Sequence, residues 1–143
     1  MRRRPDTPWH WRTITLVAGV ILLPSLTSPA AADGDATKGA STFNVCKACH
    51  RIGPGARNTV GPELNGVVGR KAASVADYSY SSALKATGIT WNEATLTQWL
   101  HSPRALVSGT KMTFAGIRKD EDVANVIAYL KTFDAQGNSV AAK

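Results

Sequence analysis

The feature that most constrains this chain is the pentapeptide Cys46-Lys47-Ala48-Cys49-His50, which holds both of its cysteines and one of its three histidines. Two cysteines separated by two residues and followed directly by histidine form the attachment pattern of a c-type haem. Each thiol can add to one vinyl group of the porphyrin, and the adjacent imidazole can ligate the iron. We therefore expect one covalently bound haem c, held by Cys46 and Cys49 with His50 on the iron.

Other interpretations of the cysteine pair have requirements of their own. A thioredoxin-like redox pair needs a preceding strand in a βαβ context, whereas residues 35–45 have a helical pattern. A zinc site needs a fourth ligand and usually a second ligand pair, but the chain has no further cysteine. A structural disulfide is compatible with an oxidising compartment. The haem interpretation explains the adjacent histidine as well, so we prefer it.

The N-terminal segment has the order of a secretory signal peptide. Four arginines precede an uncharged apolar run, and small residues follow before Asp33. We predict cleavage after Ala32, so that residues 1–32 are a cleaved secretory signal peptide and residues 33–143 are the exported domain. The mature domain would then lie in the periplasm without stable insertion into a membrane. The alternative is an uncleaved anchor facing the periplasm, because about 20 residues between Arg12 and Asp33 carry no charge. Two prolines within that stretch disfavour the anchor.

Charge and length exclude several classes of function. The first 32 residues hold four of the 17 basic and one of the ten acidic residues, which leaves 13 basic against nine acidic. These basic residues are spread singly, without the dense basic stripe and interleaved aromatics of a nucleic-acid binder. A domain of about a hundred residues has no room for a second, catalytic domain. We expect a monomer that does not bind nucleic acid. We also expect the C-terminal tail at 138–143 to be frayed.

Three stretches are predicted to be helices. The first covers residues 35–45, the second begins with a capping-box pattern at Thr90–Glu93 and stops before Pro103, and the third covers 120–133 with an acidic first turn. Their apolar faces hold Phe43 in the first, Leu96, Trp99 and Leu100 in the second, and Val123, Val126, Ile127 and Leu130 in the third. Residues 51–89 contain no convincing strand, and so long a loop is reasonable only if it wraps a large cofactor. The prediction is an all-α fold with three main helices and long loops around one haem.

The second axial ligand of the iron must come from elsewhere in the chain. Met112 is the only methionine left once Met1 is removed with the signal, and it lies in a glycine-containing loop at 108–114. A methionine that only fills a core is less expected in such a loop. The alternative ligand is His101, which lies at the polar end of the second predicted helix and which we interpret as facing solvent.

At this point the chain resembles the class I cytochromes c of the soluble bacterial and mitochondrial type and is similar to cytochrome c2. The likeness extends over residues 34–133. Besides the attachment motif, it is carried by Gly-Pro-Glu-Leu-Asn-Gly at 61–66, Val-Gly-Arg-Lys at 68–71, Tyr-Ser-Tyr at 78–80, Gly-Ile-Thr-Trp at 88–91, Gly-Thr-Lys-Met-Thr-Phe-Ala-Gly-Ile at 109–117 and Ile-Ala-Tyr-Leu at 127–130. Such a set in this order is highly specific.

The resemblance implies particular roles around the iron. His50 and Met112 would be the axial ligands, and Pro62 would offer its carbonyl to the other ring nitrogen of His50, which fixes the tautomer and strengthens the ligand. Phe114 would cover the haem edge. The resemblance also implies that the first and last helices cross through Gly39, Phe43, Val126 and Tyr129.

The same resemblance implies a polar edge of the haem site. Tyr80 and Trp91 would donate hydrogen bonds to a buried propionate, with Arg70 nearby to compensate its charge, because a buried carboxylate requires donors. Two positions depart from the family pattern, which often has tyrosine where Trp99 stands and asparagine where Leu84 stands. Trp99 can donate but not accept a hydrogen bond and Leu84 can do neither, so the polar network beside the methionine must be smaller here.

The function that the resemblance implies is one-electron transfer through an exposed haem edge, with no substrate and no enzymatic reaction. The partners would be larger redox proteins: a cytochrome complex, an oxidase, a photosynthetic reaction centre or a dehydrogenase. Basic residues that the resemblance places around the edge are Arg57, Arg104, Lys111, Arg118 and Lys119, although they would equally serve solubility. The rival class, a haem enzyme or gas binder, needs an open sixth position on the iron, so the role of Met112 distinguishes the two.

Overall fold

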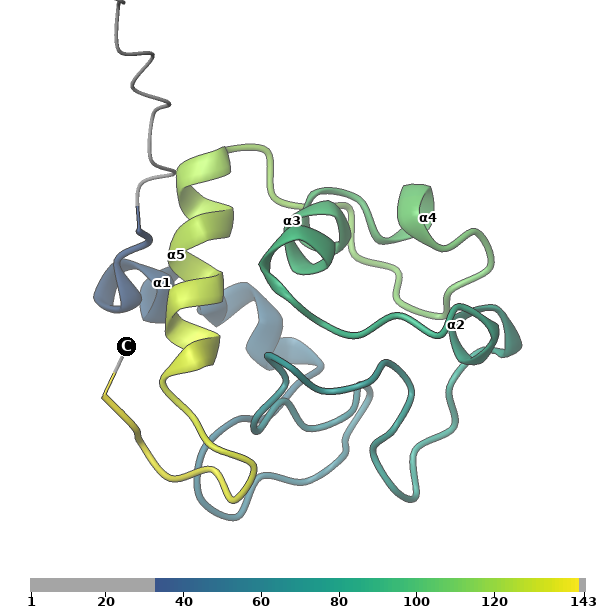
Figure 1. Ribbon diagram of the computed structural model, residues 1–143, viewed down its shortest axis with the longest axis horizontal. Coiled ribbons are helices and arrows are strands. Elements are labelled where there is room, and N and C mark those ends of the chain that lie inside the picture. Colours follow the sequence, from purple (N-terminus) through teal and green to yellow (C-terminus); the bar gives the residue numbers. More distant parts are fainter. Residues whose placement is uncertain (1–32, 142–143) are drawn as a thin grey trace, which may run out of the picture. The chain divides into compact units, whose positions relative to one another are not determined.

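The computed structural model describes residues 33–141, so the predicted signal peptide lies outside the described part of the chain. In chain order the elements are α1 (Ala36–Thr42), the 3₁₀ helix η1 (Phe43–Ala48), α2 (Ser82–Ala86), α3 (Glu93–His101), α4 (Pro103–Leu106) and α5 (Asp120–Lys131) (Figure 1). Within residues 33–141 the β-type pairing consists of two isolated bridges, Lys71 with Thr90 and Phe133 with Ser139. The predicted all-α class is confirmed. No described helix combines the length and the apolar character needed to cross a bilayer.

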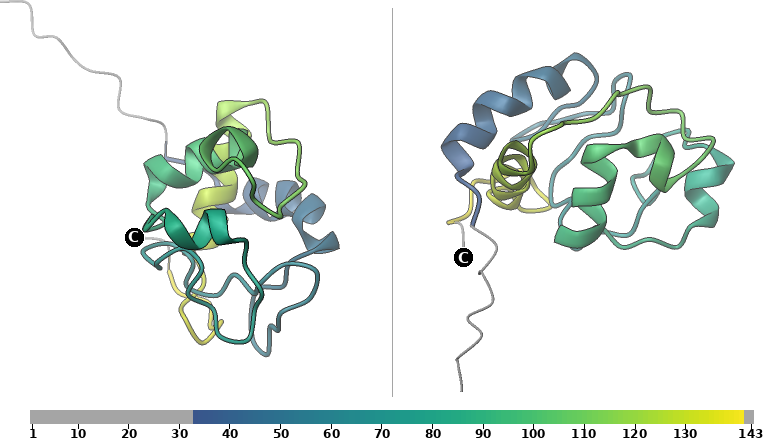
Figure 2. Two further views of the ribbon diagram at one scale, coloured as in Figure 1. Left: turned by 90° about the vertical axis from the view of Figure 1, so that its right-hand side faces the viewer. Right: turned by 90° about the horizontal axis from the view of Figure 1, so that it is seen from above.

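Helices α1 and α5 cross in close contact, as the views in Figures 1 and 2 show. Asp35 caps α1 by accepting hydrogen bonds from the backbone amides of Thr37 and Lys38. A side chain at Gly39 would place its Cβ 1.9 Å from the carbonyl oxygen of Asn125 on α5. Glycine is therefore required at this crossing because the two backbones approach too closely for any larger residue.

The apolar stripe predicted for the last helix is confirmed in α5. Val123, Val126, Ile127 and Leu130 are all buried. The ring of Phe43, at the start of η1, packs against Tyr129 with ring centroids 5.2 Å apart. The crossing thus fixes where η1 begins, three residues before the first cysteine of the attachment motif.

Helix α3 begins later than the capping-box prediction placed it. The helix N-cap is Asn92, whose side chain accepts from the Thr95 amide at 2.9 Å while the Thr95 hydroxyl accepts from the Asn92 amide at 2.9 Å. Thr90 and Trp91 cannot start the helix because Thr90 forms a bridge with Lys71, and the Trp91 amide donates to the carbonyl of Arg70 on the same side of that bridge at 2.9 Å. The predicted inward face, Leu96, Trp99 and Leu100, is buried as expected.

Two short helices were missed by the sequence patterns. Helix α2 lies inside the predicted loop 51–89, and its N-cap Ser81 accepts from the Leu84 amide at 3.1 Å. Helix α4 begins at Pro103, in the first-turn position that proline favours. Four or five residues are too few to show a helical period, so only the Ser81 cap and Pro103 mark where these helices begin.

The tail is better ordered than the sequence suggested. Asp134 accepts from the amides of Gln136 and Asn138, and the Val140 amide donates to the Thr132 carbonyl at 2.8 Å. These hydrogen bonds hold the chain as far as residue 140 against the end of α5. The prediction of a frayed tail is therefore wrong for residues 138–140, and residues 142–143 lie outside the described chain.

Candidate functional site

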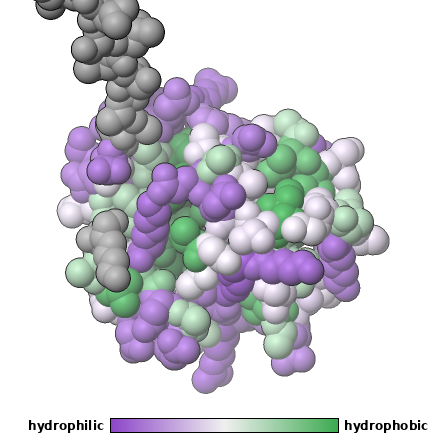
Figure 3. Space-filling model, viewed as in Figure 1, coloured by the Kyte–Doolittle hydropathy of each residue, from purple (hydrophilic) through white to green (hydrophobic). Residues whose placement is uncertain are grey.

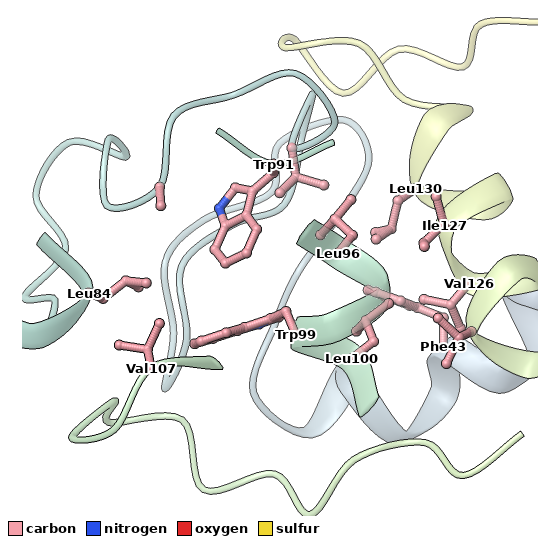
Figure 4. Close-up of a cluster of buried hydrophobic side chains, with 13 residues drawn as sticks. Phe43, Leu84, Trp91, Leu96, Trp99, Leu100, Val107, Val126, Ile127 and Leu130 are labelled. Atoms are coloured by element: carbon pink, nitrogen blue, oxygen red, sulfur yellow. The ribbon is translucent and has the colours of Figure 1, made fainter. Parts of the chain in front are cut away.

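An apolar cavity of about 360 Å³ lies between the helices. Its walls come from η1, α2, α3, α5 and the loops 60–81 and 110–114, and we call it the slot. Figure 4 shows Trp91, Trp99 and Leu84 around one part of this region, with Leu96 and Leu100 leading to the residues of α5. In Figure 3, apolar side chains reach the surface on the side of the molecule where α3 and α4 lie.

The attachment motif lies at the end of η1 and faces the slot. The amides of Cys49 and His50 both donate to the carbonyl of Cys46, at 3.0 and 2.9 Å, which turns the chain so that all three residues line the cavity. Cys46 and Cys49 do not form a disulfide with each other. Burial, with a smaller effect of Cys49, raises the pKa of the Cys46 thiol to about 11. Within residues 33–141 no three side chains of histidine, cysteine, aspartate or glutamate are grouped to hold a metal.

The imidazole of His50 is held by its Nδ1 atom. This atom lies 2.7 Å from the carbonyl oxygen of Pro62 and donates to it, since a carbonyl can only accept. Nε2 is left as the unprotonated nitrogen, which is the form that ligates a metal. Burial lowers the pKa of His50, although the bond to Pro62 acts in the opposite direction. A Cβ on Gly61 would lie 2.4 Å from the ring, so glycine is needed beside it.

Met112 also lines the slot, from a loop that several hydrogen bonds hold in place. Its amide donates to the Thr110 hydroxyl at 3.2 Å, and the ammonium of Lys111 donates to the Ser79 carbonyl at 2.9 Å. The alternative ligand does not line the slot: Nδ1 of His101 lies 2.8 Å from the Ile117 carbonyl and its Nε2 lies 3.1 Å from an Asp120 carboxylate oxygen. The interpretation of His101 as simply facing solvent is wrong, because these contacts leave it half-buried.

The structure brings the predicted polar residues together along one wall. Tyr80, Trp91 and Arg70 all line the slot, and the Trp91 amide donates to the Arg70 carbonyl at 2.9 Å. Burial is the main cause of a raised pKa of Tyr80. Glu63 was not predicted as a site residue, yet its carboxylate lies 2.7 Å from the Arg70 guanidinium. Only the opposite charges of Glu63 and Arg70, seven residues apart, pointed to this pair in the sequence.

Aromatic side chains also line the slot. The rings of Trp91 and Trp99 lie 5.1 Å apart at an interplanar angle of 53°, and Phe114 lines the slot with them. Leu84 is buried here and adds no polar group. The expectation of a smaller polar network beside Met112 stays a prediction.

The predicted basic edge is placed only in part. Lys111 lines the slot, and so does Lys71, which was not in the predicted set. The other four predicted residues are exposed, but no contact places them at the mouth of the slot: Arg57, Arg104, Arg118 and Lys119. Their role in partner binding stays a prediction.

These residues fit a haem c. Two thiols lie at one side of an apolar slot, the bond of Nδ1 to Pro62 leaves Nε2 of the imidazole with its lone pair, and a thioether lines the same slot. Flat aromatic and aliphatic surfaces complete the walls, and donor groups along one wall suit the propionates.

Comparisons with known proteins agree with this arrangement. The family model "Cytochrome c" matches residues 36–134. The chain is 45% identical over 123 residues to cytochrome c2 of Blastochloris viridis, covering 86% of this chain and 96% of that protein. It is 52% identical over 104 residues to cytochrome c-550 of Nitrobacter winogradskyi, covering 73% and 95% respectively. The solved structure of cytochrome cH from Methylobacterium extorquens superposes with a TM-score of 0.65 at 52% identity, covering 69% of this chain and 99% of that one. The chain therefore belongs to the cytochrome c family, as an electron carrier of the cytochrome c2 type with covalently bound haem c.

Proposed function

We propose that this protein is an exported periplasmic carrier that moves one electron at a time between larger redox proteins, with His50 and Met112 as the axial ligands of its haem iron. The observation that carries the proposal is the arrangement of His50, whose Nδ1 is bound to Pro62 while the ring lines the slot. Met112 lines the same slot from a different part of the chain. With two protein ligands the iron has no open coordination position for a substrate, which suits electron transfer.

The chemistry that a bound haem c supplies is a one-electron change at its iron. The chain's own contribution is to hold the axial ligands in place. A small change of geometry between the oxidised and reduced states keeps the rate of electron transfer high. Pro62 fixes the imidazole, and the bonds of Thr110 and Lys111 hold the methionine loop. Ligation by histidine and methionine in a buried site favours the reduced state, so a positive reduction potential is expected.

The polar wall is proposed to receive the haem propionates. Tyr80 and Trp91 supply uncharged donors to the slot, which a buried carboxylate needs. Arg70 on the same wall supplies further N–H groups. Phe114 and Trp99 are proposed to shield the ring from water, so that electrons leave through the remaining open edge.

Export and partners complete the proposal. The arginine-rich start, apolar run and small residues before Asp33 support removal of residues 1–32 and a mature domain of 33–143 in the periplasm. Cytochrome c2 and cytochrome c-550 relatives support redox proteins as partners. A monomer with an exposed edge suits brief encounters with such partners.

The test of the ligand assignment is Met112→Ala in the haem-loaded protein. We expect the variant to keep its covalent haem, lose the low-spin ferric spectrum and have a lower reduction potential, because water or another side chain replaces sulfur. His101→Ala is the matched control, since this histidine does not line the slot, and it should keep both properties. If Met112→Ala keeps both properties, or if the wild-type ferrous protein binds carbon monoxide without a slow displacement step, the open-position class of haem protein replaces this proposal.

A further inference from the structure

The guanidinium of Arg70 is held in the wall of the slot by three hydrogen bonds. Nη1 donates to Oε1 of Glu63 and to the Asn65 carbonyl, both at 2.7 Å, and Nη2 donates to the Glu63 carbonyl at 2.9 Å. The side chains of Arg70 and Glu63 are only 21% and 19% exposed. An ion pair with so little exposure is screened by solvent far less than a surface pair.

The carboxylate of Glu63 is fixed independently of Arg70. Its Oε2 accepts from the Asn65 amide at 2.7 Å, and the Glu63 amide donates to Asn58 Oδ1 at 3.0 Å. Asn58 in turn donates to the Ala76 carbonyl at 3.0 Å, so the loop that follows Arg70 is joined to the same network. Both charged groups are therefore held in one geometry, which distinguishes this pair from a mobile surface ion pair.

The two partners differ in what they face. Arg70 lines the slot, whereas Glu63 does not and lines a separate pocket that Arg70 also reaches. Three hydrogen bonds use three of the five N–H groups of the guanidinium, which leaves two for other acceptors. The wall thus presents N–H donors whose positive charge is already balanced by a carboxylate.

We propose that Glu63 is a positioning residue for the redox centre: its carboxylate neutralises Arg70, so that the wall offers hydrogen bonds to the haem without a net positive charge. This inference rests on the proposed function, because it requires a haem in the slot. The oxidised iron centre carries one more positive charge than the reduced one, so a net positive charge in the wall favours reduction. Glu63 therefore holds the reduction potential below the value that Arg70 alone would give.

The test is a charge cycle on this pair, read as the reduction potential of haem-loaded protein at low ionic strength. Glu63→Gln keeps the shape of the side chain, and the two backbone carbonyls still hold Arg70. We expect it to shift the reduction equilibrium toward the reduced protein on the order of tenfold, or about 59 mV for a one-electron couple. Arg70→Gln should shift the potential in the opposite direction. The potential of the double variant should return close to that of wild type, because the side chains at 63 and 70 together carry no net charge in either protein.

Glu93→Gln is the matched control, since Glu93 is exposed, is paired with Lys131 and does not line the slot. It changes the total charge equally and should move the potential much less. An unchanged optical spectrum shows that the axial ligands are intact in each variant. A shift in Glu63→Gln no larger than in Glu93→Gln, or a double variant that matches Arg70→Gln alone, overturns the inference. Failure of the proposed function is distinct, because the wild type would then lack a covalent haem or a reversible one-electron wave.

Discussion

Gly61 offers a direct test of how the histidine is positioned. A Cβ at this residue would lie 2.4, 2.7 and 2.8 Å from three atoms of the His50 ring. The Gly61 backbone cannot move away easily, because its amide donates to the Cys49 carbonyl at 2.7 Å and its carbonyl accepts from the Thr59 amide at 2.8 Å. In Gly61→Ala the imidazole must therefore move, and its bond to Pro62 is the contact most directly affected.

The size of the effect follows from these contacts. Carbon atoms pack at about 3.5–4.0 Å, so the ring must retreat by roughly 1 Å. Overpacking of this kind costs about 1–3 kcal/mol, and loss of the His50–Pro62 hydrogen bond costs about 0.5–1.5 kcal/mol. Replacing glycine by alanine restricts the unfolded chain and offsets about 0.4–1 kcal/mol. We expect a net loss of about 1–3 kcal/mol, together with an altered ligand field at the iron.

The assay is urea unfolding of the ferric, haem-loaded protein, with the optical spectrum recorded before denaturant is added. Gly55→Ala is the control: its Cβ would have no neighbour within 4 Å, but its φ of 71° is unfavourable for alanine. The control should lose about 1 kcal/mol and keep the wild-type spectrum, because its cost is confined to its own backbone. If Gly61→Ala matches wild type in both stability and spectrum, the contact with the ring does not position His50 and the reasoning is refuted.

Two further predictions concern the edge and the core. Electron transfer to an acidic partner should slow as ionic strength rises, and Lys111→Glu should slow association more than Lys85→Glu, because Lys111 lines the slot and Lys85 does not. Equal effects of the two reversals in stopped-flow measurements, or a rate independent of salt, would favour a role in solubility alone. Replacing Cys46 and Cys49 by alanine should prevent stable attachment and leave the chain largely unfolded by circular dichroism, because the haem fills the slot. A cooperative unfolding transition in that apo variant would contradict this prediction.

The sequence predicted the features that depend on local pattern. The α5 stripe and the end of α3 before Pro103 follow from periodicity and proline, which act within a few residues. The start of α3 could not be predicted from local pattern, because Thr90 is held by its bridge with Lys71, nearly twenty residues away. A capping pattern can only state which residues are able to cap, and the long-range bridge decided between Thr90 and Asn92.

The same distinction applies to the site. The attachment motif is local, so the grouping of Cys46, Cys49 and His50 was predictable from spacing alone. The contact of His101 with the Ile117 carbonyl joins residues 16 apart and depends on the path of the methionine loop. The pairing of Arg70 with Glu63 likewise depends on the turns between them, which periodicity does not describe. What sequence could not supply was the set of partners that each polar group finds after folding.

The proposed axial ligands belong to parts of the chain that are held in different ways. The histidine follows η1, whose start is fixed by the packing of Phe43 on Tyr129 and by the close approach of Gly39 to α5. The methionine lies on a loop held mainly by hydrogen bonds, including the one from the Ile117 amide to the Leu100 carbonyl at 2.8 Å. Hydrogen bonds in an exposed loop open at lower free energy than a packed helix crossing. We therefore expect the proposed bond from the iron to Met112 to break first, while the two thioether links and the histidine stay with the packed helices.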